Sequence, residues 1–297
     1  MMPRRLPGIA LFMLAGTVTA AAQKATFSIE SGEVRMDVLV TDNGKPVAGL
    51  SAADFEVFDN GVAQEIHSAI LQKQTPISAT LVLDMSRSLA GNPLGHLKDA
   101  AGRLLADLKD EDYVALITFN NAVMLGSPPT RDLSRIKLAL DQAQPLGNSS
   151  LIDGSYAALV LAESRPDQPL VIIFSDGRDT FSWLTSPVVL DTAKSNDAVV
   201  YAVTTDHQAS KTFLGDLTRL TGGFLLEVES TRDLGAVFLN ILDEFRQRYV
   251  LGYTPQGVSE SGWHKVDVHV KHRSAKVSAR PGYLRSSPGE QTEKPGG

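Results

Sequence analysis

Two short segments of the chain combine carboxylates with hydroxyl groups. Asp84-Met85-Ser86-Arg87-Ser88 places one carboxylate and two hydroxyls at alternate positions, and Ser175-Asp176-Gly177 supplies a second carboxylate further along the chain. Neither segment contains His, and the whole chain has no Cys. Carboxylate and hydroxyl oxygens are hard ligands, which suit Mg²⁺, Mn²⁺ or Ca²⁺ better than zinc or copper. The residue types therefore predict an oxygen-only site for a divalent cation. We expect Mg²⁺, with Mn²⁺ or Ca²⁺ as the alternatives.

Each of these segments directly follows an apolar run that has the pattern of a buried strand, residues 79–83 before Asp84 and residues 170–174 before Ser175. A continuous apolar run is typical of a strand that is covered on both faces. In a doubly wound sheet, ligands bind outside the carboxyl ends of the strands at the switch point. If the two strands are neighbours there, Asp84 and Asp176 converge. Two adjacent carboxylates repel each other and favour a cation between them.

Strand and helix patterns alternate from residue 77 to about residue 246. An amphipathic helix is predicted after Asp84, because Leu94, Leu97, Ala101, Leu104, Leu105 and Leu108 recur at helical spacing. Further helices are predicted over residues 133–143, 152–163, 187–195, 212–221 and 234–246, and further strands over 114–119, 198–203 and 224–228. This alternation predicts an α/β fold with a doubly wound, Rossmann-like, mainly parallel sheet covered by helices on both faces.

Strand patterns without helices flank this region, over residues 26–76 on the N-terminal side and residues 247–285 on the C-terminal side. Turns such as Asp42-Asn43-Gly44-Lys45-Pro46 separate the strands, since Asn-Gly tolerates positive φ. Neither flank alone is large enough to bury much apolar area. We therefore predict that both flanks form one small antiparallel β-sandwich, with the α/β domain (residues 77–246) inserted between them.

The first residues of the chain indicate export. Residues 1–22 begin with Arg4 and Arg5, continue with a short apolar run and end in Ala20-Ala21-Ala22, which is the pattern of a cleaved signal peptide. The run is too short for a permanent membrane helix, so we expect no membrane insertion after cleavage. Residues 286–297 have the composition of a disordered tail. The protein is predicted to be periplasmic or secreted. Its net charge of −6 argues against binding to nucleic acid or to an acidic membrane surface.

The order of these motifs resembles the von Willebrand factor A-type domain and its metal-ion-dependent adhesion site. The resemblance rests on the apolar strand followed by Asp84-x-Ser86-x-Ser88, on Gly147-Asn-Ser149-Ser-Leu-Ile-Asp153 and on the later Ser175-Asp176-Gly177. The flanks, with Asp54-Phe-Glu-Val-Phe-Asp-x-Gly and Pro281-Gly-Tyr283, are similar to exported bacterial A-domain proteins often found in acidobacteria.

The resemblance implies roles for five residues. Ser86, Ser88 and Ser149 would be direct hydroxyl ligands of the cation, and Asp84 and Asp176 would bind it directly or through water. An acidic residue of a partner protein would complete the coordination. Two departures stand out: Ser149 occupies a position where the family usually has Thr, and Arg87 one where Gly is common.

The resemblance implies a non-enzymatic binding module, and the motifs of other functions are missing from the sequence. A phosphatase of the haloacid-dehalogenase kind needs a second Asp two positions after its nucleophile, and Ser86 stands there. No Gly-x-Ser-x-Gly elbow and no nucleotide-binding glycine motif occurs. A secreted structural scaffold without metal-dependent binding stays open as an alternative, as does the reading of the Asp84 loop as a helix cap without metal.

Five further side chains have an expected environment. Asp153 is expected to cap the helix over 152–163 or to steady the metal loop. Trp183 is either an exposed aromatic at the metal face or part of the packing. His264 and His269 are predicted to be surface residues, together with His272.

Overall fold

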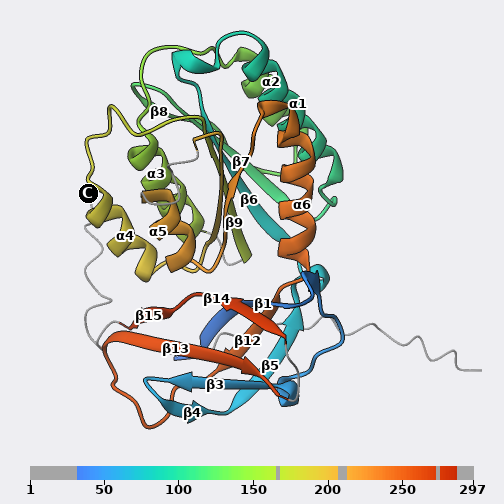
Figure 1. The fold of residues 1–297 in the computed structure, drawn as a ribbon, viewed down its shortest axis with the longest axis vertical. Helices are drawn as coiled ribbons and strands as arrows, with labels where there is room; N and C mark the ends of the chain where they lie inside the picture. The colour runs from blue at the N-terminus through green and yellow to red at the C-terminus, as the bar shows by residue number, and fades with distance from the viewer. Residues whose placement is uncertain (1–31, 165–167, 207–212, 272–274, 286–297) are drawn as a thin grey trace, which may run out of the picture. The chain divides into compact units, whose positions relative to one another are not determined.

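The computed structural model describes residues 32–164, 168–206, 213–271 and 275–285, which form three β-sheets with helices packed on one of them (Figure 1). The predicted signal peptide (1–22), the tail (286–297) and His272 lie outside the described residues. Among the described residues, no helix is both long enough and apolar enough to span a bilayer.

A six-stranded sheet in the order β11-β10-β9-β6-β7-β8 forms the centre of the α/β domain. All neighbours run parallel except β8, which is antiparallel to β7. The mainly parallel sheet predicted from the apolar runs is therefore confirmed. The strands are β6 (Ile77–Asp84), β7 (Tyr113–Phe119), β8 (Val123–Thr130), β9 (Gln168–Ser175), β10 (Val199–Thr204) and β11 (Leu225–Glu227).

Helices cover both faces of this sheet, as Figure 1 shows. Successive residues of β6 alternate between the two faces: Leu81 and Leu83 join one apolar core, and Val82 joins the other. The first core includes residues of α1 (Asn92–Asp107), α2 (Leu133–Gln142) and α6 (Leu234–Arg246). The second includes residues of α3 (Leu151–Glu163), α4 (Ser186–Lys194) and α5 (Phe213–Leu220). Short 3₁₀ helices are η1 (Ala52–Asp54), η2 (Gln72–Gln74), η3 (Arg87–Leu89) and η5 (Thr231–Asp233).

The N-terminal and C-terminal strands pair with one another in two antiparallel sheets. β1 lies between β12 and β14, and β3 pairs with β13, so each sheet combines strands from both ends of the chain. One apolar core, which includes Met36, Val57, Leu251 and Val266, is shared between the sheets. The predicted insertion of the α/β domain into a β-sandwich is confirmed. The strands are β1 (Val34–Asp42), β2 (Lys45–Pro46), β3 (Phe55–Asp59), β4 (Val62–Gln64), β5 (Ile66–Leu71), β12 (Tyr249–Tyr253), β13 (Gly262–Val270), β14 (Lys276–Ala279) and β15 (Gly282–Arg285).

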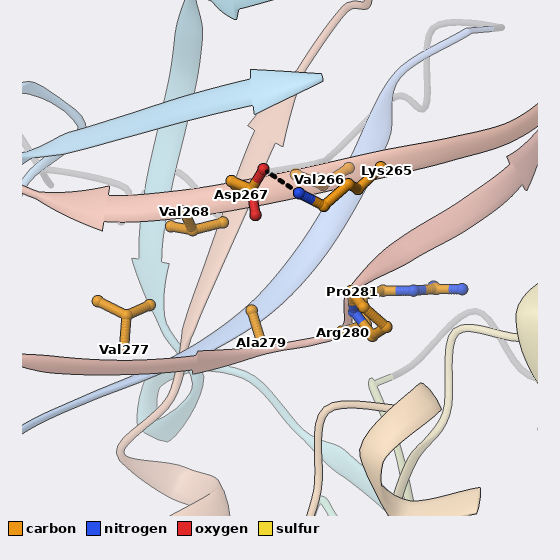
Figure 2. A pocket seen from close by; sticks show the side chains of 8 residues that line it. All are labelled: Lys265, Val266, Asp267, Val268, Val277, Ala279, Arg280 and Pro281. Carbon is orange, nitrogen blue, oxygen red and sulfur yellow. Dashed lines mark hydrogen bonds and ion pairs between the residues drawn. The ribbon is translucent and has the colours of Figure 1, made fainter. Parts of the chain in front are cut away.

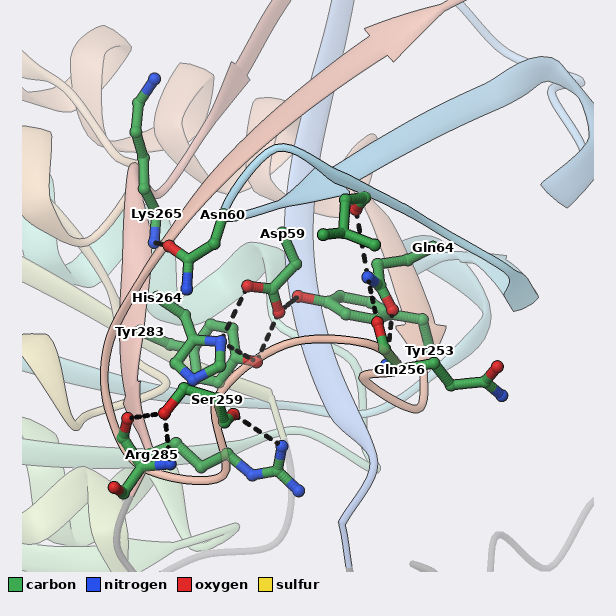
Figure 3. Close-up of polar contacts among 12 residues, drawn as sticks. Asp59, Asn60, Gln64, Tyr253, Gln256, Ser259, His264, Lys265, Tyr283 and Arg285 are labelled. Carbon is green, nitrogen blue, oxygen red and sulfur yellow. Dashed lines mark hydrogen bonds and ion pairs between the residues drawn. The ribbon is translucent and has the colours of Figure 1, made fainter.

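A buried polar cluster lies at the end of this sandwich core (Figure 3). His264 Nδ1 lies 2.7 Å from Asp59 Oδ1, and the hydroxyls of Tyr283 and Tyr253 donate to Asp59 Oδ2 at 2.7 and 3.2 Å. Burial raises the pKa of both tyrosines above the ordinary value. His264 is 0% exposed, so the prediction of a surface histidine is wrong at this position. An imidazole can enter an apolar core when a buried carboxylate accepts its hydrogen bond.

A cavity of about 240 Å³ separates β13 from β14, which follow each other in the chain but belong to different sheets (Figure 2). Val268, Val277 and Ala279 form its apolar part, and an ion pair of 3.0 Å between Lys265 and Asp267 lies on β13. The walls of this cavity include none of the predicted metal-site residues.

Two buried arginines connect the β-sandwich to the α/β domain. Arg248 is 0% exposed and donates to the hydroxyl of Tyr201 (3.1 Å) and to the carbonyl of Gly222 (2.7 Å). Arg280 donates to the carboxylate of Asp197 at 2.9 Å. A buried guanidinium requires several acceptors. The contacts of Arg248 therefore hold the start of β12 against the α/β domain, and those of Arg280 hold the turn after β14 against it.

Candidate functional site

The predicted site forms because β6 and β9 are direct neighbours in the sheet. Leu83 is paired in parallel register with Phe174, so Asp84 at the end of β6 and Asp176 just after β9 emerge at the same edge. The order of the strands reverses here, since β7 lies on one side of β6 and β9 on the other. This edge is the switch point at which doubly wound sheets bind ligands.

The carboxylate of Asp84 accepts three hydrogen bonds from different segments. Ser149 donates to Oδ2 at 3.0 Å, Ser175 donates to the same oxygen at 2.7 Å, and the backbone N–H of Ser86 donates to Oδ1 at 2.8 Å. Asp84 is 0% exposed, and Ser86 and Ser149 are also buried. Three separate parts of the chain thus hold this carboxylate in one orientation.

The serines of the loop after β6 connect Asp84 to Asp176. The hydroxyls of Ser86 and Ser88 lie 3.0 Å apart, and the hydroxyl of Ser88 donates to Asp176 Oδ1 at 3.0 Å. Through these contacts and the backbone N–H of Ser86, all five predicted residues are joined in one hydrogen-bonded group.

The electrostatics of this group favour a cation. Burial raises the pKa of Asp84 above its ordinary value, against the lowering effect of its hydrogen bonds. Burial also raises the pKa of Asp176, and the charge of Asp84 raises it further. Each carboxylate therefore loses hydration, and the two repel each other. A divalent cation between them would compensate both costs, and the oxygen-only donors fit a hard ion.

The loop that carries Ser149 is fixed from two sides. Met85 accepts a hydrogen bond from Leu146 N (2.8 Å), and Arg87 N donates to the carbonyl of Gly147 (3.1 Å). Ser150 N donates to the carbonyl of Asn120 in the turn after β7. Gly147 has a φ of +72°, and a Cβ there would lie 2.3 Å from the side chain of Asn121. Glycine is therefore required where this loop passes the neighbouring turn.

The segment after Asp176 runs along the Ser149 loop as the rim of the site. The carbonyl of Ser149 accepts hydrogen bonds from the backbone N–H groups of Thr180 (2.9 Å) and Phe181 (3.0 Å). The carboxylate of Asp153 accepts from the backbone of Trp183 and of Leu184, both at 2.9 Å. Asp153 lies in the first turn of α3, and its carboxylate steadies the rim.

Trp183 itself is 89% exposed, which decides between the two expectations in favour of the exposed aromatic. Phe181, two positions earlier on the same rim, is 43% exposed.

Ser175 is the functional residue to which sequence reasoning assigned no role. It is the last residue of β9, and its hydroxyl makes the shortest of the side-chain hydrogen bonds to Asp84. Its position before Asp176 was visible in the sequence. The direction of its side chain depends on the pairing of β9 with β6 and could not be read from the motif alone.

The described residues contain no group of three or more His, Cys, Asp or Glu side chains that could hold a metal ion. A cation at this site would therefore depend on serine hydroxyls for much of its protein coordination, in addition to the two carboxylates.

Comparison with known proteins places this geometry in a family. A family model for the von Willebrand factor type A domain matches residues 80–178, which contain all five predicted site residues. Among solved structures, the chain is similar to proximal thread matrix protein 1 from the mussel byssus, solved with a zinc-occupied MIDAS motif, with a TM-score of 0.51 and 16% identity over 61% of this chain. It is also similar to a D319A mutant of the PilB minor pilin from Streptococcus sanguinis, with a TM-score of 0.50 and 12% identity over 59% of this chain.

A third similar structure is an aerotolerance-related membrane protein from Bacteroides fragilis NCTC 9343 with multiple mutations to serines, with a TM-score of 0.48 and 14% identity over 58% of this chain and 99% of that one. The chain spans only 48% of the mussel protein and 62% of the pilin, so these likenesses concern the fold of the shared part. The family model and the sheet topology show that residues 80–178 of this chain belong to a von Willebrand factor type A domain.

Proposed function

We propose that the protein is an exported, non-enzymatic binding module whose A domain holds one divalent cation through Asp84, Ser86, Ser88, Ser149 and Asp176. An acidic residue of a partner protein completes the coordination of this cation. The observation that carries the proposal is the hydrogen-bonded group that joins the buried Asp84 to Asp176 through Ser86 and Ser88.

The identity of the cation follows from the donors. Two carboxylates and three hydroxyls favour Mg²⁺, which keeps several waters and accepts an additional carboxylate in place of one of them. Mn²⁺ and Ca²⁺ are the alternatives. Because the mussel protein was solved with zinc in its motif, Zn²⁺ belongs in the same comparison.

The loop after β6 lacks the second acid that a phosphatase would need. Ser86 stands two positions after Asp84, where a phosphatase of the haloacid-dehalogenase kind would need a carboxylic acid. A binding role needs only the cation, an open coordination position and a surface around it. Export and a periplasmic or extracellular location are part of this proposal, supported by the pattern of residues 1–22.

Calorimetric titration of metal-stripped protein with Mg²⁺, Mn²⁺, Ca²⁺ and Zn²⁺ tests the cation site. We expect one ion per chain in the wild type and none in an Asp84→Ala/Ser86→Ala variant of confirmed fold. The matched control is Asp141→Ala, which removes an exposed carboxylate of α2 and leaves metal binding unchanged.

Partner binding is then compared with and without a chelator. A partner that binds the wild type only with metal, and does not bind the double variant, supports the module. A wild type that folds but binds no ion would contradict the proposal and favour the structural scaffold. Partners that bind equally well in the presence of a chelator would also contradict the proposal and favour the structural scaffold.

A further inference from the structure

A second cavity, of about 200 Å³, opens beside the metal site. Its lining includes Gly177 and Arg178, the residues that follow Asp176, together with the start of α3 and the start of α5. Because Gly177 is bonded to Asp176, the lining of the cavity begins one residue away from a predicted ligand of the cation.

The interior of the cavity is apolar. Leu151, Ile152 and Leu214, which are 3%, 8% and 1% exposed, contribute to its lining. An apolar cavity of roughly 150 Å³ is large enough to bind benzene. The space here is therefore sufficient for one aliphatic side chain.

The mouth of the cavity carries charge of both signs. Arg178, whose side chain is 69% exposed, lies 3.7 Å from the carboxylate of Asp206, which is 20% exposed. A basic side chain entering here would meet the guanidinium of Arg178, and an acidic one would meet Asp206 and Asp179. An uncharged apolar side chain meets neither repulsion, and its burial is favourable.

The cavity and the metal site are held at a fixed spacing by the same two segments. Ile152 N donates to Asp179 Oδ1 at 3.3 Å, and Ser149 donates to Asp84 at 3.0 Å. The segment 149–152 thus contributes to both sites, and so does the segment 176–179. A ligand that occupies both sites therefore has a defined distance between its two groups.

We propose that this cavity receives an aliphatic side chain of the partner, close in the partner's chain to the carboxylate that completes the cation. The inference rests on the proposed function and narrows the partner to one that presents an acidic residue together with a neighbouring Leu, Ile, Val or Met. Two contacts at a fixed spacing give the domain selectivity that a single carboxylate on a metal ion does not provide.

The test uses an array of synthetic peptides, each with one Asp or Glu and with Ala, Leu, Ile, Val, Met, Lys or Arg at the flanking positions. Binding to the wild-type protein is measured in Mg²⁺ and in EDTA. We expect aliphatic neighbours to strengthen the Mg²⁺-dependent binding of acidic peptides by about tenfold over Ala.

Two variants close the cavity from different sides. In Gly177→Leu, a residue that lines the cavity gains a side chain, and its added Cβ has no atom within 4 Å and so causes no clash. Ser186→Leu fills the cavity from the start of α4, on a different element from the metal loop. Both should lose the aliphatic preference and keep Mg²⁺-dependent binding of acidic peptides with Ala neighbours. Gly102→Leu on α1, where a Cβ also has no atom within 4 Å, is the matched control and keeps the preference.

The outcomes separate the two proposals. Mg²⁺-dependent binding of acidic peptides without an aliphatic preference, or with a preference for Lys or Arg, overturns the assignment of the cavity and leaves the proposed function standing. An aliphatic preference that persists in both Gly177→Leu and Ser186→Leu also overturns the assignment of the cavity. Absence of any metal-dependent recognition of acidic peptides contradicts the proposed function, and the assignment of the cavity fails with it.

Discussion

The hydroxyl of Ser149 donates a hydrogen bond of 3.0 Å to the carboxylate of Asp84, and the two residues are separated by 65 positions in the chain. The backbone of Ser149 also contacts the rim of the site, since its carbonyl accepts from Thr180 and Phe181. One residue thus joins the end of a central strand to the surface that a partner would meet.

Replacing Ser149 with Ala should weaken Mg²⁺ binding about tenfold to a hundredfold, because the variant loses the hydroxyl that holds Asp84 and that is proposed to bind the ion. Ser149→Thr should bind Mg²⁺ about as well as the wild type, since the hydroxyl remains and the added methyl restricts its rotamer. Calorimetric titration of the three proteins measures the effect. Equal affinities in Ser149→Ala and wild type would exclude Ser149 from the site.

Asp84→Asn should remove the stabilisation of the fold by metal. Without metal the variant should be at least as stable as the wild type, because a desolvated charge and its repulsion with Asp176 are both removed. With Mg²⁺ at about 100 times its Kd, the wild type should gain about 2.7 kcal/mol and the variant nothing.

Thermal unfolding with and without Mg²⁺ measures this difference, with Asp141→Asn as the control at an exposed position. A metal-dependent shift that persists in Asp84→Asn would contradict the assignment.

Arg248→Met should destabilise the protein by about 3 kcal/mol or more. The variant leaves the carbonyl of Gly222 and the hydroxyl of Tyr201 without their buried donor. Chemical denaturation measures the loss. Arg135→Met on α2, whose side chain is 69% exposed in its ion pair, should change the stability by less than about 1 kcal/mol.

Asp37 should make the stability depend on pH in the acidic range. Burial raises the pKa of its carboxyl to about 6, against the lowering effect of the nearby Arg248, and Asp197 contributes a further increase. Because the pKa in the folded state exceeds that of the unfolded chain, the stabilising contribution of Asp37 is complete below the unfolded value of 3.8 and is lost as the pH rises through about 6.

Asp37→Asn lacks this dependence. The free energy of unfolding of the wild type should therefore fall relative to the variant, by an amount on the order of 3 kcal/mol between about pH 4 and about pH 7. Denaturant titrations at several pH values measure this difference. Asp42→Asn, at the exposed end of the same strand, is the control. A constant difference between wild type and Asp37→Asn across this range would show that the pKa of Asp37 is ordinary.

Gly222→Ala should cost more than about 2 kcal/mol of stability. Its φ is +76°, and an added Cβ would lie 2.6 Å from the backbone nitrogen of Arg280. Gly102→Ala, in the middle of α1 and with no atom near the added Cβ, should instead stabilise the protein by up to about 1 kcal/mol. Denaturation of both variants measures the contrast, and a neutral Gly222→Ala would show that the turn after β14 adapts.

Much of the fold could be predicted because the signals are local. The apolar run before Asp84 has the pattern of a strand buried on both faces, and the stripe that contains Leu97 and Leu104 has the period of a helix; both elements are present as β6 and α1. His264 shows the limit of this reasoning. Its residue type and its strand do not reveal that Asp59, from the other end of the chain, accepts its hydrogen bond in the core.

The sequence by itself determined the kind of chemistry at the site, because the donor atoms of Asp84, Ser86 and Ser88 follow from residue type and from their place after a buried strand. Only the tertiary structure decided that β9 lies beside β6, that Ser175 also contacts Asp84, and that a cavity opens next to Asp176. The physical reason is that periodicity and turn chemistry act over a few residues. Strand order, burial and cavities depend on contacts between segments far apart in the chain, whose energies no local pattern contains.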